Sequence, residues 1–210
     1  MSRVRLSLFL ALLAILPMAA HGQSASPSDD WLDDLRLGGH VIVFRHGATT
    51  QAKADPMSNP MGRKNDAERQ LTDQGRAQAE AIGEAMRRLK IPVAMVLTST
   101  LQRAIDTGTL LGFGEIQATT DLTESGPSIS PDENERRAQV LRHLVSVHPP
   151  ADNNVVIVTH KPNIVAAFGN DWSGIREGEA SVFEPDGKGG FKLVATVQAA
   201  AWSRLAQSQH

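Results

Sequence analysis

The chain has 210 residues and no cysteine, and its 21 basic and 23 acidic residues give a formal net charge of −2. The absence of cysteine excludes disulfides, thiol nucleophiles and thiolate metal sites. The slightly acidic balance, the lack of a long basic run and an aromatic content of 4% argue against a nucleic-acid partner.

The N-terminal segment has the pattern of a secretory signal peptide. Arg3 and Arg5 precede an apolar run at residues 6–17, and small residues follow up to Gly22. The apolar run is shorter than the about 20 residues that span a bilayer. We therefore predict that residues 1–22 are a cleaved signal peptide and that the protein is periplasmic or secreted. Retention of the segment as an N-terminal anchor stays open.

The rest of the chain has the length of one domain. Residues 23–30 are rich in Ser, Pro and Asp and are expected to be a flexible N-terminal segment. Residues 31–203 are expected to form a single domain. Residues 204–210 are expected to be a polar tail.

Apolar runs and helical periodicities alternate along this domain. Thr72 is expected to cap one helix, and Ser99 or Thr100 is expected to cap the next. The predicted helices cover about residues 31–37, 73–90, 100–112, 132–147 and 162–168, and the predicted strands cover residues 40–44, 93–97, 155–158, 181–184 and 191–197. This alternation predicts a three-layer α/β/α sandwich with a mainly parallel central sheet, to which the last two strands add an antiparallel hairpin.

Polar side chains with phosphate-binding chemistry follow three of the predicted strands. Arg45 and His46 follow the first, Arg103 lies in the helix after the second, and Thr159 and His160 follow the third. Because ligands bind beyond the carboxyl ends of parallel strands, we expect these side chains to share one site. Guanidinium groups hold phosphoryl oxygens bidentately and keep their charge. The pattern therefore predicts a phosphate site.

The same residues suggest a reaction. A neutral histidine can attack phosphorus and form a covalent intermediate, and the departing alkoxide then needs a proton donor. Glu124, in a polar loop at residues 119–131, is the best-placed acid in the sequence, and Asp121 is the second candidate.

Five sequence blocks carry a resemblance to a known family. They are VIVFRHG at residues 41–47, LTDQGRAQA at 71–79, TSTLQRA at 98–104, LTE at 122–124 and VVIVTH at 155–160. In these blocks the chain resembles the short branch of the histidine phosphatase superfamily, also called phosphoglycerate mutase-like. The resemblance implies the phosphoglycerate mutase-like fold, His46 as a nucleophile that forms a phosphohistidine intermediate, and Glu124 as the general acid. It also implies that Arg45, Arg103 and His160 complete the phosphate pocket, with no metal and no cofactor.

The chain also departs from the mutases of that family. Mutases usually continue the Arg-His-Gly motif as Glu-Ser-x-x-Asn, whereas this chain continues as Ala-Thr-Thr-Gln at residues 48–51. Phosphoglycerate mutation is therefore not expected, and Thr49 or Gln51 is expected to supply the missing hydrogen bonds to the substrate. Lys161 adds a positive charge beside His160, which would suit a substrate with a second anionic group.

Together these inferences predict an exported, metal-independent histidine phosphatase that hydrolyses a small phosphate ester or an envelope-derived one, such as a lipopolysaccharide-type phosphate. The main alternative is a non-catalytic periplasmic module that binds phosphorylated ligands. A metal-dependent hydrolase that uses His46 and His160 as ligands is a further alternative, but no His-Glu-x-x-His motif accompanies them. No integral membrane span is expected after signal removal, and the oligomeric state stays open.

Overall fold

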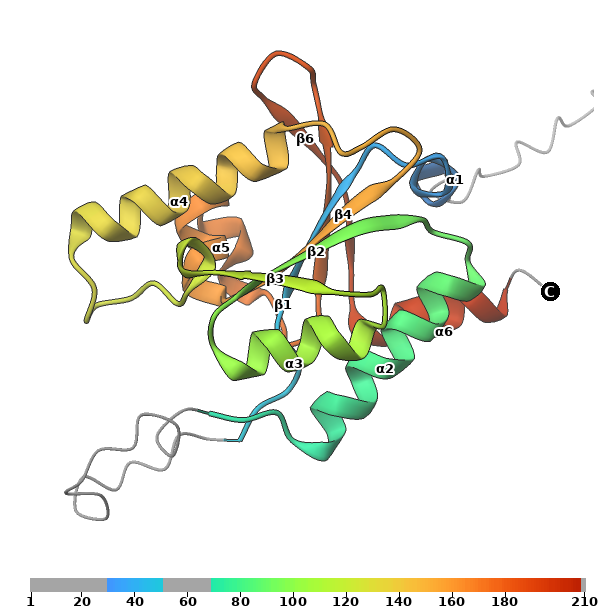
Figure 1. Cartoon of the computed structure of the whole chain (residues 1–210), viewed down its shortest axis with the longest axis horizontal. Helices are drawn as coiled ribbons and strands as arrows, with labels where there is room; N and C mark the ends of the chain where they lie inside the picture. Colours follow the sequence, from blue (N-terminus) through green and yellow to red (C-terminus); the bar gives the residue numbers. More distant parts are fainter. Residues whose placement is uncertain (1–29, 51–68, 209–210) are drawn as a thin grey trace, which may run out of the picture.

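A computed structural model of the protein describes residues 30–50 and 69–208. Its strands are β1 (Val41–Arg45), β2 (Val93–Ser99), β3 (Ile116–Thr119), β4 (Asn154–Thr159), β5 (Ala180–Pro185) and β6 (Phe191–Val197). They form one sheet in the order β3-β2-β4-β1-β5-β6 (Figure 1). The first four strands in this order run parallel, and β5 and β6 add the predicted antiparallel hairpin beside β1.

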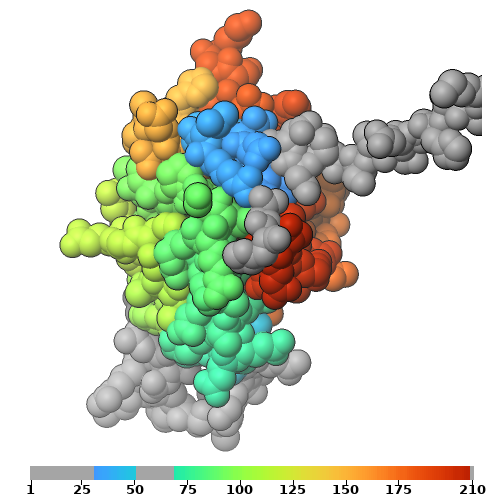
Figure 2. Space-filling view, turned by 90° about the vertical axis from the view of Figure 1, so that its right-hand side faces the viewer, coloured from blue at the N-terminus to red at the C-terminus, as the bar shows by residue number. Residues whose placement is uncertain are grey.

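Helices cover both faces of this sheet. In the described residues they are α1 (Asp30–Leu37), α2 (Asp73–Arg88), α3 (Gln102–Leu111), α4 (Pro131–Ser146), α5 (Lys161–Phe168) and α6 (Ala199–Gln207), with the short 3-10 helices η1 (Thr120–Leu122) and η2 (Asn170–Gly174). The helices α1, α2, α3 and α6 pack on one face, and α4 and α5 pack on the other (Figure 1). Figure 2 shows α2 and α6 side by side at the surface of the first layer. The predicted three-layer α/β/α fold class is confirmed.

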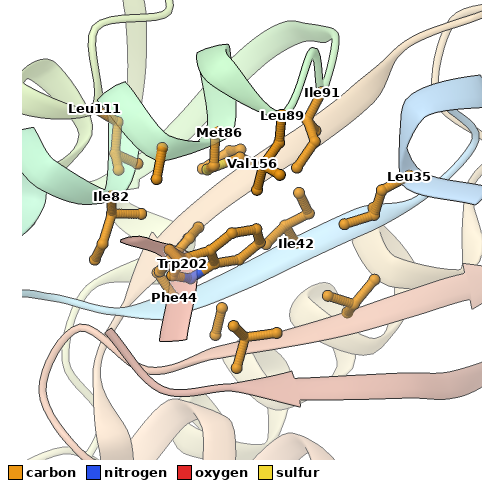
Figure 3. Close-up of a cluster of buried hydrophobic side chains, with 14 of the residues drawn as sticks. Leu35, Ile42, Phe44, Ile82, Met86, Leu89, Ile91, Leu111, Val156 and Trp202 are labelled. Carbon is orange, nitrogen blue, oxygen red and sulfur yellow. The ribbon is translucent and has the colours of Figure 1, made fainter. Parts of the chain in front are cut away.

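The alternation of side chains along β1 builds a core on each face of the sheet. Ile42 and Phe44 lie in the core that α1, α2 and α6 cover, whereas Val41 and Val43 lie in the core under α4 and α5. Trp202 of α6 closes the first core, with its ring centroid 6.2 Å from that of Phe44 (Figure 3). Central strands of this kind are buried on both faces, and for that reason they appear in the sequence as continuous apolar runs.

Local signals explain where α2 and α3 begin. The prediction for α2 is confirmed, because Thr72 is its N-cap and Thr72 Oγ1 accepts a hydrogen bond of 3.0 Å from the Gly75 amide. The prediction that Ser99 or Thr100 caps α3 is wrong. The N-cap is Leu101, whose side chain makes no capping bond, because Ser99 is still the last residue of β2.

Two elements were not predicted from the sequence. The edge strand β3 has no buried residue, so no continuous apolar run marks it in the sequence. Helix α6 crosses the predicted domain boundary at residue 203, and it buries both Trp202 and Ala206. The predicted polar tail at 204–210 is therefore corrected: the domain extends to Gln207, because the last turn of α6 contributes to the core.

Several predictions fall outside the described residues. They concern the signal peptide at residues 1–22, nearly all of the segment at residues 23–30, and Gln51. Among the helices that the structure describes, none has the length and apolar character needed to cross a membrane.

Candidate active site

The carboxyl ends of β1, β4 and β2 lie at the same edge of the sheet. Arg45 of β1 pairs with Thr159 of β4, and β2 pairs with β4 in parallel on the other side. The His46 amide donates a hydrogen bond of 3.1 Å to the Thr159 carbonyl. The ring centroids of His46 and His160 are 5.3 Å apart. The two histidines therefore lie together, as their positions after two strands predict.

His46 is held as a neutral imidazole. The residue is only 1% exposed, and its Nδ1 is 2.8 Å from the Gly47 carbonyl oxygen. Because a carbonyl can only accept, Nδ1 carries the hydrogen and Nε2 keeps its lone pair. Burial, reinforced by the charges of Arg103 and Arg45, lowers the pKa of His46 to about 3. The geometry thus presents an unprotonated Nε2 at physiological pH.

His160 is fully buried, and its Nε2 lies 2.7 Å from Ser99 Oγ. Ser99 Oγ already accepts a bond of 3.0 Å from the Leu101 amide, so its own hydrogen is available to His160 Nε2. In that arrangement the imidazole proton is on Nδ1, a buried atom without a hydrogen-bond partner among the described residues. Burial and the charge of Arg103 lower the pKa of His160 well below its ordinary value. A neutral His160 therefore offers one donor to an entering anion.

Arg45 is partly committed to the protein and partly available. Its NH1 donates a bond of 2.9 Å to the Ile175 carbonyl, and its NH2 lies 3.3 Å from Glu177 Oε1. Its Nε is buried and has no hydrogen-bond partner in the part of the chain that the structure describes. Burial lowers the pKa of Arg45, yet a guanidinium keeps its charge at any physiological pH. An unsatisfied buried Nε–H in the residue before His46 would fit a phosphoryl oxygen.

Glu124 lies between two arginines. Its Oε2 accepts a hydrogen bond of 2.5 Å from NH2 of the buried Arg103, and its Oε1 lies 3.5 Å from NH2 of Arg69. The Glu124 side chain is 34% exposed, so a substrate can reach it. Asp121 instead pairs with Arg136 at 2.8 Å on the exposed side of α4. The structure therefore places Glu124, and not Asp121, at the candidate site.

The other predicted substrate contacts have mixed outcomes. Thr49 reaches the site, but its Oγ1 donates to Glu177 Oε1 at 2.9 Å, so its hydrogen is already used. Lys161 is the first residue of α5, directly after His160, and is partly buried. Its contact with a substrate stays a prediction, and Gln51 lies outside the described residues.

The turn that follows His46 is fixed from two helices. From α3, Thr107 Oγ1 donates to the Arg103 carbonyl at 2.7 Å and accepts from the Gly47 amide at 3.0 Å. From α2, Gly75 packs so closely that a Cβ atom there would lie 2.1 Å from the Ala48 carbonyl oxygen. A Cβ atom at Gly47 would in turn lie 2.9 Å from the Gly75 carbonyl oxygen, so both positions need glycine. The Thr107 bonds also connect the turn after His46 to the helix that carries Arg103.

Sequence reasoning missed four residues of this site: Ser99 as the partner of His160, Thr107, Arg69 and Glu177. Ser99 and Thr107 lie in or just after the TSTLQRA block and could have been examined for this reason. Nothing in the sequence marks Glu177, because its partner Thr49 is 128 residues away along the chain. Among the residues described, no group of three or more His, Asp or Glu side chains could hold a metal ion.

The sheet defines an α/β protein whose candidate site gathers two histidines and two arginines, and known families were compared with it. The model of the histidine phosphatase superfamily (branch 1) matches residues 41–128. Over these residues the chain is similar to that superfamily, and the match together with the fold supports phosphatase activity. None of the curated proteins matches the sequence significantly.

Solved structures agree on the fold. The protein histidine phosphatase SixA, complexed with tungstate, is 17% identical with a TM-score of 0.56, and the match covers 77% of this chain and 97% of SixA. Phosphoserine phosphatase of Entamoeba histolytica, in complex with 3-phosphoglyceric acid, is 16% identical with a TM-score of 0.52 and coverages of 76% and 96%. Mycobacterial glucosyl-3-phosphoglycerate phosphatase is 20% identical with a TM-score of 0.52 and coverages of 75% and 98%.

Proposed function

We propose that the protein is a metal-independent phosphomonoesterase that uses His46 as its nucleophile. The observation that carries this proposal is the state of His46, whose Nδ1 is held by the Gly47 carbonyl and whose Nε2 keeps its lone pair. Two nearby buried donors, Arg45 Nε and His160 Nδ1, lack partners among the residues that the structure describes. A bound phosphoryl group would supply acceptors for both.

In the first step, His46 Nε2 attacks phosphorus and the bond between phosphorus and the ester oxygen breaks. The leaving oxygen takes a proton from Glu124 and departs as an alcohol, which leaves a phosphohistidine. In the second step, water attacks phosphorus, the nitrogen–phosphorus bond breaks, and Glu124 takes up the proton of the water. Inorganic phosphate then leaves and His46 is neutral again.

Phosphate binding prepares Glu124 for this role. Without substrate, the Glu124 carboxylate is held by Arg103 at 2.5 Å. An entering dianion competes for the same guanidinium. The ion pair between Arg103 and Glu124 therefore exchanges for one between Arg103 and the phosphoryl group.

The substrate and the location are further parts of the proposal. The segment at residues 1–22 supports export, and an exported enzyme of this kind would act on small phosphate esters or on envelope-derived, lipopolysaccharide-type phosphates. SixA acts on protein phosphohistidine and the Entamoeba histolytica protein acts on phosphoserine, according to their names. Glu124 favours an ester with an alcohol leaving group for this chain, because such a leaving group benefits from a proton donor.

The test is hydrolysis of p-nitrophenyl phosphate by the purified protein in the presence of a chelator. We expect the activity to survive the chelator and to disappear in a folded His46→Ala variant. His143→Ala is the matched control, because His143 is an exposed histidine of α4. Tight binding of inorganic phosphate without turnover of any ester would favour the alternative, a non-catalytic module. Loss of activity in the chelator would contradict metal independence.

A further inference from the structure

One buried side chain makes hydrogen bonds to the backbone on both sides of Glu124. Asn163 lies in the first turn of α5 and is only 1% exposed. Its Oδ1 accepts a hydrogen bond of 3.0 Å from the Ser125 amide, and its Nδ2 donates one of 2.9 Å to the Thr123 carbonyl. The Asn163 amide therefore brackets Glu124, bonding the residue before it and the residue after it.

These bonds connect Glu124 to the phosphate pocket. Asn163 follows His160 by one turn at the start of α5, and His160 is the N-cap of that helix. From α4, Arg137 NH1 donates to the Thr123 and Glu124 carbonyls at 3.0 Å each. The segment is thus fixed to both helices on this face of the sheet, and Asn163 ties its backbone to the helix that begins at His160.

The fixation matters most when substrate is bound. In the substrate-free protein, the pair with Arg103 helps to hold the Glu124 carboxylate. When a phosphoryl group takes over Arg103, that hold is lost. The position of the carboxyl group then depends on Arg69, whose NH2 lies 3.5 Å from Oε1, and on the backbone from which the side chain extends. A proton donor must lie within hydrogen-bond distance of the leaving oxygen, and small displacements reduce the rate strongly.

We propose that Asn163 is a positioning residue for Glu124, which keeps the proton donor aligned with the leaving group while Arg103 binds the phosphoryl group. This inference rests on the proposed function, since it concerns the reaction at that site. It makes a selective claim. Loss of Asn163 impairs protonation of the leaving group and leaves the attack by His46 largely intact.

Leaving-group dependence separates this role from a purely structural one. An alkyl phosphate needs the proton donor, whereas p-nitrophenolate departs readily without it. Glu124→Gln defines the pattern expected for loss of the donor. Asn163→Asp keeps the acceptor for the Ser125 amide but replaces the donor to the Thr123 carbonyl with an oxygen. We expect kcat/KM, which reports the steps up to release of the alcohol, to fall on the order of tenfold or more for glycerol phosphate and less than about threefold for p-nitrophenyl phosphate.

The matched control is Asn154→Asp. Asn154 is also fully buried and also uses both amide atoms on backbone groups, since it accepts from the His40 amide and donates to the Leu35 and Pro92 carbonyls. It begins β4, whereas the candidate site follows the other end of that strand. This control reports what the loss of a buried asparagine does to stability and to both rates without touching the Glu124 segment. Asn163→Ser serves as a second variant if Asn163→Asp fails to fold.

The double variant Glu124→Gln/Asn163→Asp gives the sharpest outcome. If Asn163 acts through Glu124, the double variant loses no more activity on glycerol phosphate than Glu124→Gln alone. Three results would overturn the inference: equal losses on the two substrates in Asn163→Asp, a selective loss on glycerol phosphate in Asn154→Asp, or additive losses in the double variant. The proposed function would still stand in each case, because the wild-type protein turns over both esters. A wild-type protein that hydrolyses neither ester would overturn both.

Discussion

Acidification is expected to destabilise the phosphate-free protein through His46. In the folded protein burial lowers the pKa of His46 from its ordinary value of 6.5 to about 3. Between these two values the unfolded chain binds one proton more at this position than the folded protein does. The free energy of unfolding therefore rises with pH in this window, and the contribution that is complete above pH 6.5 is lost as the pH falls towards 3.

The size of the effect follows from the width of the window. Within the window each pH unit corresponds to about 1.4 kcal/mol. Acidification from about pH 7.5 to about pH 4.5 crosses about two units of the window, those below pH 6.5, and so removes about 3 kcal/mol through His46. His160, whose pKa is also lowered by burial, acts in the same direction. Losses of this size are a large part of the about 5–15 kcal/mol that stabilises a typical domain.

The assay compares urea unfolding of wild type and His46→Asn at both pH values. The asparagine amide can donate to the Gly47 carbonyl as Nδ1 does but takes up no proton in this range. All other titrating groups are common to both proteins, so the wild type should lose about 3 kcal/mol more than the variant. Losses that agree within about 0.5 kcal/mol would refute the reasoning, because His46 would then not be buried as a neutral imidazole.

Three further predictions concern single substitutions. Arg103→Ala should lower kcat/KM for an aryl phosphate at least about a hundredfold, because a preorganised phosphoryl contact stabilises the transition state by several kcal/mol. Circular dichroism should show that the variant is folded. A near-normal rate would show that Arg103 does not contact the phosphoryl group. Glu124→Gln should lower kcat/KM for alkyl phosphates far more than kcat/KM for aryl phosphates in steady-state assays. Equal slowing would argue against Glu124 as the acid. Gly75→Ala should reduce the free energy of unfolding by about 1–3 kcal/mol in urea titrations and also lower kcat. Its Cβ would lie 2.1 Å from the Ala48 carbonyl oxygen, in the turn after His46.

Much of the fold was predictable because its signals are local. The apolar runs of β1 and β4, the Thr72 cap of α2 and the glycine-rich turn before β6 all lie within short stretches of sequence. The strand β3 was missed because it is an exposed edge strand. The helix α6 was missed because its Trp202 is recognisable as a core residue only when the sheet against which it packs is known.

The site was predictable where its polar side chains come directly after a strand in the sequence, as His46 and His160 do. Contacts between distant segments were not. The sequence left both Glu124 and Asp121 open as the acid, and only their partners in space, Arg103 and Arg136, separate them. Glu177 went unnoticed for the same reason.

The central claim is that His46 takes up the phosphoryl group, and trapping the phosphoenzyme tests it most directly. Glu124→Gln should accumulate this species from p-nitrophenyl phosphate, because the substitution removes the group that takes the proton of the attacking water. An alkaline quench followed by peptide mass spectrometry should find phosphate on His46. This phosphate should be lost in acid and should be absent from the His46→Asn variant. The proposed mechanism would be contradicted if the wild-type protein turns over the ester but Glu124→Gln carries no phosphate on His46. Phosphate on another residue would contradict it as well.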